Sequence, residues 1–115
     1  MSGALEPGGS VRLALTTCPD ESTARRIART LVEERLIACG NVVPELTSIY
    51  RWQGVIEETG ECLLLMKTPA GRLGALAERL AALHPYEVPE LLVLDVEQGA
   101  GAYLRWVLEE TTDLS

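Results

Sequence analysis

Two amphipathic helical patterns, each set between segments rich in strand-forming residues, constrain the fold of this chain most strongly. The first pattern consists of Ala24, Ile27, Ala28, Leu31 and Val32, and the second of Leu73, Leu76, Ala77, Leu80 and Leu83. Apolar residues that recur three and four positions apart mark the buried face of a helix. The spacing therefore predicts one helix from the N-cap Asp20 to Leu36 and another that begins at Pro69.

The segments between and around these helices are typical of β-strands. We predict strands over residues 11–17, 39–46, 47–57, 61–68 and 90–96, a turn at 58–60, and a short closing helix over 102–110. The centres of 61–68 and 90–96 are continuously apolar, which is typical of strands that are buried on both faces.

The order β-α-β-β-α-β plus a C-terminal helix predicts an α+β fold of the split βαβ type, an antiparallel sheet with helices on one face. The other face is left uncovered although its strands are apolar, and a second copy of the chain is the simplest cover. Residues 1–10 are expected to form a flexible tail, and residues 11–115 a single domain.

The charge balance narrows the choice of partners. The chain has 10 Lys and Arg against 17 Asp and Glu, a formal charge of −7. This balance disfavours binding to nucleic acid, which requires clustered basic residues, and to an anionic membrane surface. No apolar run is long enough to span a membrane, and the first ten residues do not resemble a secretory signal. The chain has three cysteines, which are far apart in sequence. Because this pattern is not typical of a disulfide framework, we expect reduced thiols and a cytoplasmic location.

The segment 84–90, His-Pro-Tyr-Glu-Val-Pro-Glu, carries the clearest candidate for chemistry. Its two prolines stiffen the backbone around the only histidine of the protein. His84 lies close in sequence to Glu87 and Glu90, and imidazole with carboxylate is a partial ligand set for zinc or copper. The alternative is a rigid turn in which His84 caps the preceding helix.

Cys18 and Lys67 are further candidates. Cys18 lies between the first strand and a helix N-terminus, a position that favours the thiolate. Lys67, the only lysine, ends an apolar strand, where it either forms a structural ion pair or serves as a Schiff-base nucleophile. Because no general base accompanies it at a recognisable spacing, we do not expect an enzyme.

The aromatic residues fall in two short segments. Tyr50 and Trp52 flank Arg51, while Tyr103 and Trp106 lie in the expected last helix. Aromatic residues and arginine are enriched at protein interfaces. The two tryptophans are therefore candidates either for the core or for an interface between subunits.

Several short motifs, taken together, resemble the CutA family of divalent-cation tolerance proteins. They occur in the family's order at residues 17–21, 38–41, 48–54, 67–68, 84–90 and 103–106. The resemblance covers residues 11 to about 110. It implies a ferredoxin-like fold, a tight homotrimer, a cytoplasmic protein and a role in the response to copper and other divalent metal ions.

The resemblance also implies a ligand set. Metal binding in the family has been placed on a thiol of the first strand, the histidine of the His-Pro-Tyr segment and the glutamate of the Pro-Glu pair. The last two match His84 and Glu90, whereas Thr16 stands where the family has its cysteine. Cys18, two positions later, would share a strand face with Thr16 if the strand extends that far.

Two functional hypotheses follow from the resemblance and the residues. In the first, His84, Glu90 and Cys18 hold weakly bound copper or another divalent cation, Tyr86 shapes the pocket, and Tyr50, Trp52 and Trp106 contribute to the trimer interface. In the second, a PII-like signalling trimer binds a small anionic metabolite in clefts between subunits, using Lys67, Arg51 and Tyr86. No organic cofactor is expected in either case.

Overall fold

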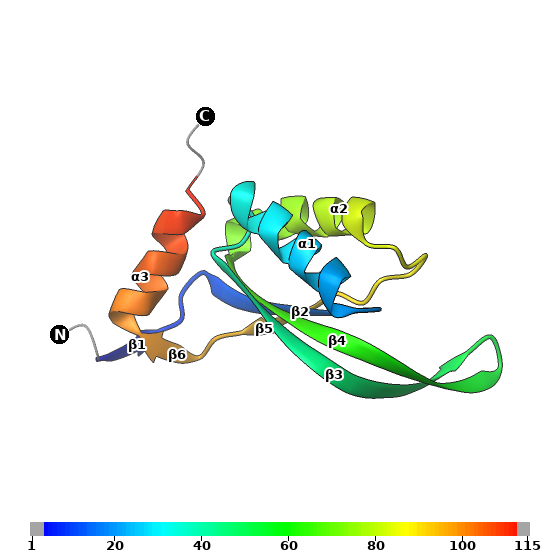
Figure 1. Ribbon diagram of the computed structural model, residues 1–115. Coiled ribbons are helices and arrows are strands. Elements are labelled where there is room, and N and C mark those ends of the chain that lie inside the picture. Colours follow the sequence, from blue (N-terminus) through cyan, green and yellow to red (C-terminus); the bar gives the residue numbers. More distant parts are fainter. Residues whose placement is uncertain (1–3, 113–115) are drawn as a thin grey trace.

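The computed structural model describes residues 4–112 and has a four-stranded antiparallel sheet at its centre. The strand order is β3-β4-β2-β5, and two helices, α1 and α2, cover one face of this sheet (Figure 1). The bounds are β2 Val11–Cys18, α1 Glu21–Glu33, β3 Cys39–Trp52, β4 Val55–Pro69, α2 Leu73–Leu83 and β5 Leu92–Asp95. The predicted α+β class and the antiparallel sheet with helices on one face are thereby confirmed.

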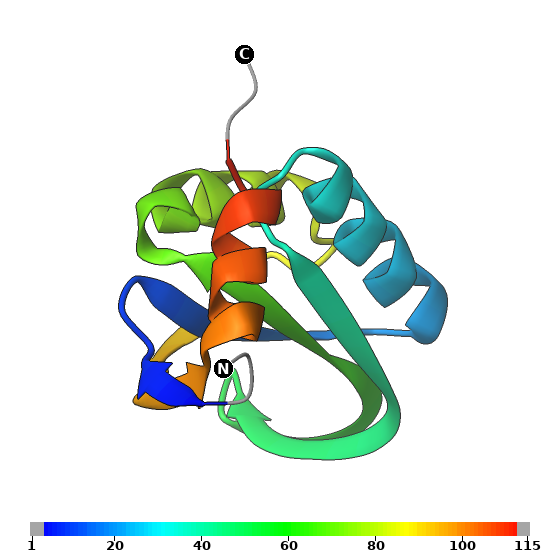
Figure 2. The same ribbon diagram turned by 90° about the vertical axis from the view of Figure 1, so that its left-hand side faces the viewer.

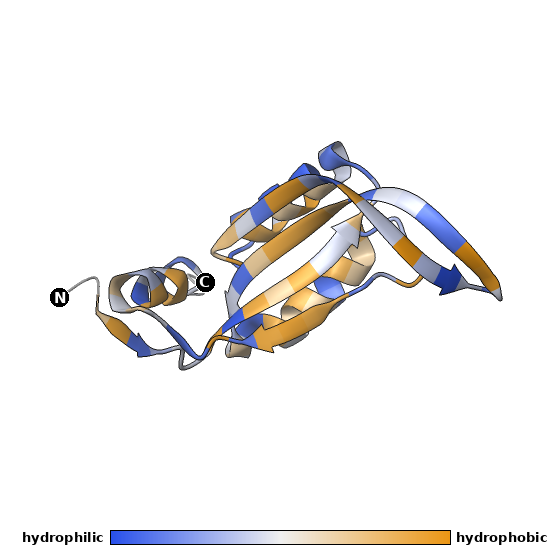
Figure 3. Cartoon of the chain, turned by 90° about the horizontal axis from the view of Figure 1, so that it is seen from below, coloured by the Kyte–Doolittle hydropathy of each residue, from blue (hydrophilic) through white to orange (hydrophobic). Residues whose placement is uncertain are grey.

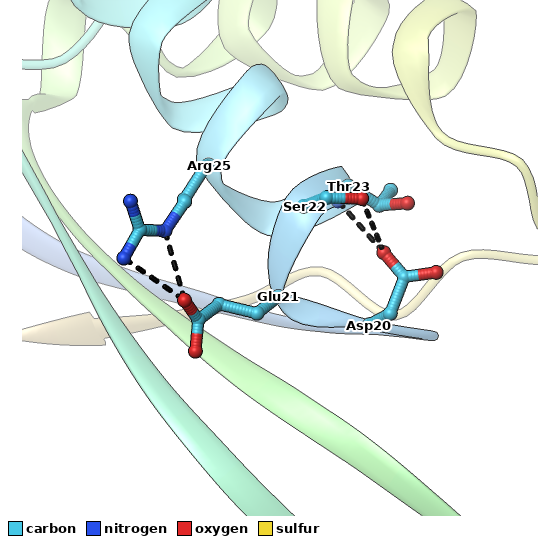
Figure 4. A network of polar contacts seen from close by, with 5 residues as sticks. All are labelled: Asp20, Glu21, Ser22, Thr23 and Arg25. Atoms are coloured by element: carbon cyan, nitrogen blue, oxygen red, sulfur yellow. Dashed lines mark hydrogen bonds and ion pairs between the residues drawn. The ribbon is translucent and has the colours of Figure 1, made fainter.

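Asp20 caps α1 as the sequence predicts. Its carboxylate accepts a hydrogen bond from the backbone N–H of Thr23 at 2.8 Å and another from the hydroxyl of Ser22 at 3.1 Å (Figure 4). These bonds hold the pKa of Asp20 below its usual value, the contact with Thr23 most of all. Glu21 and Arg25 form an ion pair one turn apart at 2.9 Å. The helix ends at Glu33, three residues before the predicted end.

Strands β3 and β4 form one long hairpin that extends beyond the helices (Figure 1). The predicted turn at 58–60 is wrong, because residues 58–60 pair within the ladder and the chain reverses at Gln53 and Gly54. Both turn residues have positive φ, 51° and 83°, which is the requirement of a two-residue type I′ turn. The strand predicted at 39–46 and residues 47–52 of the one predicted at 47–57 form the single strand β3, with an irregularity between Val43 and Leu46, whereas residues 55–57 begin β4. Pro44, which lacks an N–H to donate, lies at that irregularity.

The core lies between the sheet and the two helices, and alternation along the strands decides which residues enter it. Ala14, Thr16 and Cys18 of β2 are fully buried, as are Leu64 and Met66 of β4. The residues between them, Leu13, Leu15, Leu63 and Leu65, are only half-buried and face the other side of the sheet. Ile27 and Leu31 of α1 and Leu76 and Leu80 of α2 complete the buried cluster.

Part of the predicted N-terminal tail is instead a strand. Within residues 1–10, β1 (Leu5–Pro7) pairs with β6 (Gln98–Ala100), and Gly8 donates a backbone hydrogen bond to Glu97. Helix α3 (Gly101–Glu110) follows β6, and Arg105 pairs with Glu6 at 3.3 Å. This small ladder and α3 lie at the end of the sheet remote from the hairpin turn (Figures 1 and 2).

The face of the sheet opposite α1 and α2 carries broad apolar bands (Figure 3). Large apolar side chains are exposed along β5 and around the hairpin turn: Ile49, Val55, Ile56, Leu92, Val93 and Leu94. Patches of this kind mark interaction surfaces in soluble proteins. Among residues 4–112, no helix has the length and apolar character that crossing a bilayer requires.

Candidate functional site

A cleft of about 590 Å³ opens beside the half of the long hairpin that carries the turn. Ten residues from β2, β3, β4 and the segment after α2 line it: Thr17, Ser48, Ile49, Tyr50, Trp52, Glu61, Tyr86, Glu87, Val88 and Glu90. Three of them are carboxylates and three are aromatic, and no lysine or arginine is among them. The cleft therefore favours a cation over an anion.

His84 holds the segment that forms one wall of this cleft. Its backbone N–H donates to the carbonyl oxygen of Leu80 and so caps α2, as the alternative interpretation of the sequence predicts. In the buried ring, Nδ1 accepts a hydrogen bond from the backbone N–H of Tyr86 at 3.1 Å. Nε2 must then carry the hydrogen, which it donates to the backbone carbonyl oxygen of Thr17 at 2.8 Å. Both ring nitrogens are thus engaged within the chain.

Tyr86 and Glu61 form a partly buried polar contact in the cleft. The phenol donates to Oε2 of Glu61 at 2.5 Å, and Glu61 is only 8% exposed. Burial, followed by this contact with the carboxylate, raises the pKa of Tyr86 well above its usual value. Tyr86 therefore remains a hydrogen-bond donor at any physiological pH.

Glu61 and Thr17 line the cleft but are not among the candidate residues that the sequence predicts. Glu61 precedes an apolar strand centre and reads as the first residue of a buried strand. The alternation of side chains along the strand nevertheless indicates its position, because Glu61 shares a face with Leu63 and Leu65, the face that the helices leave uncovered. Thr17 contributes a backbone carbonyl oxygen, a group to which its residue type gives no clue.

Cys18 occupies the opposite side of the sheet. Strand β2 does extend to Cys18, which shares the core face with Thr16, and both are fully buried. The predicted thiolate is wrong, because burial raises the pKa of Cys18 to about 11, with Cys62 and Glu61 adding to the effect. Thr17, the residue before Cys18 in β2, faces the other side of the sheet and lines the cleft.

The three candidate ligands are therefore not gathered into one cluster. Glu90 and the exposed Glu87 line the cleft, His84 lies behind its wall, and Cys18 faces the core. Among residues 4–112, no three His, Cys, Asp or Glu side chains are close enough to hold a metal ion. A complete ligand set in this cleft requires a further donor from outside the single chain or a movement of its carboxylates.

The residues considered for an anion are also apart. Lys67 donates through Nζ to the side-chain oxygen of Asn41, the polar partner that a half-buried ammonium needs. Lys67 lies six residues along β4 from Glu61, about 20 Å at the rise of an extended strand. Arg51 is exposed on the hairpin and does not line the cleft. Tyr86 alone of the three belongs to the cleft.

The tryptophans are not core residues. Trp52 is 44% exposed near the hairpin turn, and Trp106 is 40% exposed on α3. Trp106 packs against Tyr103 with ring centroids 5.5 Å apart. Of the two interpretations offered for these rings, their exposure favours an interface.

Comparison with known proteins places the chain in a family. A sequence model described as CutA1 divalent ion tolerance protein matches residues 12–110. The chain is 54% identical over 99 residues to the divalent-cation tolerance protein CutA of Thermus thermophilus, covering 86% of this chain and 96% of that protein. It is 50% identical over 107 residues to Protein CutA of Mus musculus, covering 93% of this chain and 60% of that protein.

Solved structures agree with the sequence comparison. The crystal structure of CutA from Xylella fastidiosa superimposes with a TM-score of 0.88 at 46% identity, covering 90% of this chain and all of that chain. This chain spans about 60% of the length of the mouse and human relatives.

Proposed function

The chain belongs to the CutA1 divalent ion tolerance family, and from this premise we propose that it binds copper or another divalent cation at modest affinity as a homotrimer. Residues 11–115 would form its single, ferredoxin-like domain, to which β1 adds by pairing with β6. The response to metal ions, the cytoplasmic location and the absence of catalysis belong to the same proposal. The observation that carries it is the acidic cleft.

The donor groups of the cleft suit a divalent cation. Glu61, Glu87 and Glu90 supply carboxylate oxygens, which hard and borderline divalent cations accept as ligands. Glu61 already accepts a hydrogen bond from Tyr86, so Glu90 and Glu87 are the freer pair. Cys18 and His84, the softer donors that copper favours, have their reactive atoms directed to the core or engaged in hydrogen bonds.

His84 enters this proposal as a positioning residue. Through Thr17 and Tyr86 its ring ties β2 to the segment that carries Glu87 and Glu90. Losing the ring would loosen the cleft wall. A direct bond from His84 to the metal would first require one of its two hydrogen bonds to break.

The exposed apolar residues support the assembly. Leu92, Val93 and Leu94 of the edge strand β5 are 43–56% exposed. An edge strand with apolar side chains is an unfavourable surface for a free monomer and a ready site for another chain. A further copy would cover this edge and bring additional donors to the cleft, and the family resemblance sets the number of copies at three.

An enzyme is disfavoured by the same geometry. The cleft offers neither a free imidazole nor an amine, because both nitrogens of His84 are engaged and Lys67 lies elsewhere. The PII-like alternative has no support in the relatives reported above, and the acidic cleft does not suit an anion.

Calorimetric titration with Zn²⁺ and with Cu²⁺ tests the metal site. We expect Glu90→Gln to weaken binding by about tenfold, whereas Glu109→Gln on the exposed surface of α3 serves as the matched control and binds like the wild type. Equal binding by Glu90→Gln and the wild type would remove the cleft from the proposal. If His84→Ala abolishes binding while Glu90→Gln retains it, His84 is the ligand and not a positioning residue.

Sedimentation equilibrium tests the assembly. We expect a trimer at micromolar concentration and a shift to smaller species for Leu94→Glu on β5. A folded monomer of the wild type under these conditions would contradict the proposed trimer, whatever the metal titration shows.

A further inference from the structure

Two cysteines face each other across the central strands. Cys18, the last residue of β2, is paired in antiparallel register with Cys62 of β4, and both are free thiols. Residues paired in this way point to the same face, with Cα atoms about 4.5–5.5 Å apart. A disulfide requires a Cα separation of about 4.4–6.8 Å. The backbone therefore already lies within the range of a cross-strand disulfide.

The surroundings of this pair exclude other thiols. Both cysteines belong to the buried cluster beneath α1, with 0% and 5% of their surfaces exposed. The third cysteine, Cys39, is paired with Lys67 on β4, five residues from Cys62. That offset is about 17 Å along the strand and, being odd, places Cys39 on the other face. The nearest thiol to Cys18 is thus Cys62.

The fold also leaves the hydroxyl of Thr16 without a hydrogen-bond partner within residues 4–112. Thr16 Oγ1 is buried and has no hydrogen-bond partner among the described residues. It lies on the same face of β2 as Cys18, two positions earlier. Buried polar groups are rarely left unpaired. If a cysteine sulfur in this part of the core is oxidised to a sulfenic acid, the hydroxyl of Thr16 is available to donate a hydrogen bond to the new oxygen atom.

We propose that Cys18 and Cys62 are a redox pair that a hydroperoxide oxidises to an intramolecular cross-strand disulfide. One thiol, as its thiolate, attacks the peroxide, so that an S–O bond forms, the O–O bond breaks, and the alcohol or water leaves. The second sulfur then attacks the resulting sulfenic acid, forming the S–S bond and releasing water. Two thiols lose two electrons and two protons in total, and one peroxide is reduced.

Access to the pair comes from its position in the strand. Cys18 ends β2, and ladder ends open locally more readily than ladder centres. Burial makes the reaction slow, because the raised pKa of Cys18 keeps the thiolate scarce at neutral pH. The pair therefore responds to sustained exposure to an oxidant.

Peptide mapping of the full chain after treatment with hydrogen peroxide tests this directly. Trypsin separates the cysteines into three peptides, 13–25 with Cys18, 36–51 with Cys39 and 52–67 with Cys62. We expect peptide 13–25 linked to 52–67, with the mass loss of two hydrogen atoms, and a chain that runs as a monomer on a non-reducing denaturing gel. Reduction should release both peptides.

Variants complete the test. Cys39→Ala, the matched control, should form the same link at the same rate, and Cys62→Ala should abolish it. A link that involves peptide 36–51, a link between chains, or an unlinked product oxidised to sulfinic acid would each overturn the proposal. If Cys62→Ala does not fold, the mapping of the wild type decides the question by itself.

Discussion

The phenolic hydroxyl of Tyr86 donates to the carboxylate of Glu61 over 2.5 Å, and this contact joins the segment after α2 to strand β4. Without it, a carboxylate that is 8% exposed would lose its donor. Tyr86→Phe should therefore lower the free energy of unfolding by about 1.5 kcal/mol, the lower end for hydrogen bonds to charged groups. Urea denaturation followed by circular dichroism measures this change.

Tyr50→Phe is the control for this prediction, because the Tyr50 hydroxyl forms its hydrogen bond with the hydroxyl of Thr59 at an exposed site. Its effect should stay within about 0.5 kcal/mol. Equal urea midpoints for Tyr86→Phe and the wild type would show that the contact does not stabilise the fold.

The cap of α1 predicts a pH dependence. The pKa of Asp20 lies below its usual value, chiefly through the N–H of Thr23. The native state therefore favours the carboxylate, and this stabilisation is present at neutral pH and is lost as pH falls through the lowered pKa. Asp20→Ala should lower the melting temperature at neutral pH and have little effect in acid, where the wild type has lost the charge.

Asp20→Asn separates charge from hydrogen bonding at this cap. The amide oxygen still accepts from Thr23, so most of the stability should remain, but the variant should lack the acid-dependent loss attributed to Asp20. Thermal melts at neutral and strongly acidic pH measure both effects. A difference between the wild type and Asp20→Asn that is the same at both pH values would argue against a titrating cap.

The hairpin turn depends on Gly54, whose φ is +83°. A side chain in this left-handed region is strained, so Gly54→Ala should destabilise the protein by about 1 kcal/mol. Gly60→Ala is the matched control, because Gly60 lies in β4 with no heavy atom within 4 Å of an added Cβ and no positive φ. Denaturation midpoints compare the two, and an equal loss in both would show that the turn conformation is not the cause.

Substitutions on the core face of β4 should destabilise the protein far more than substitutions on its other face. Leu64 is fully buried against α1 and α2, so Leu64→Ala should cost about 2–5 kcal/mol. Its neighbour Leu63 is half-buried on the uncovered face, and Leu63→Ala should cost clearly less. Chemical denaturation measures both variants, and equal losses would contradict the division of the strand into two faces.

Features that rest on local chemistry could be predicted from the sequence. The helix that begins at Glu21 follows from an acidic cap and apolar residues at spacings of three and four, both of which lie within one short segment. The central strands follow from runs such as 63–66. The prolines on the C-terminal side of His84 predict that it caps the helix, because they prevent the helix from continuing.

Features that depend on distant partners could not be predicted in the same way. Strands β1 and β6 have three residues each and exist because segments more than ninety positions apart pair with one another. The turn was misplaced because Gln53 is an unusual residue at positive φ, whereas Glu58-Thr59-Gly60 resembles a turn in composition. The pKa of Cys18 depends on its burial in the core and on Cys62, which lies 44 positions later in the sequence.

The alternation of side chains along β2 and β4 divides their positions into those that the fold constrains and those that can change. Even-numbered positions such as Ala14, Leu64 and Met66 are committed to the fold, and few side chains fit there. Odd-numbered positions such as Leu13 and Leu65 point away from the helices, so their side chains can vary without disturbing the packing of the helices. Descendants of such a chain can therefore change what they associate with while inheriting the same folded core.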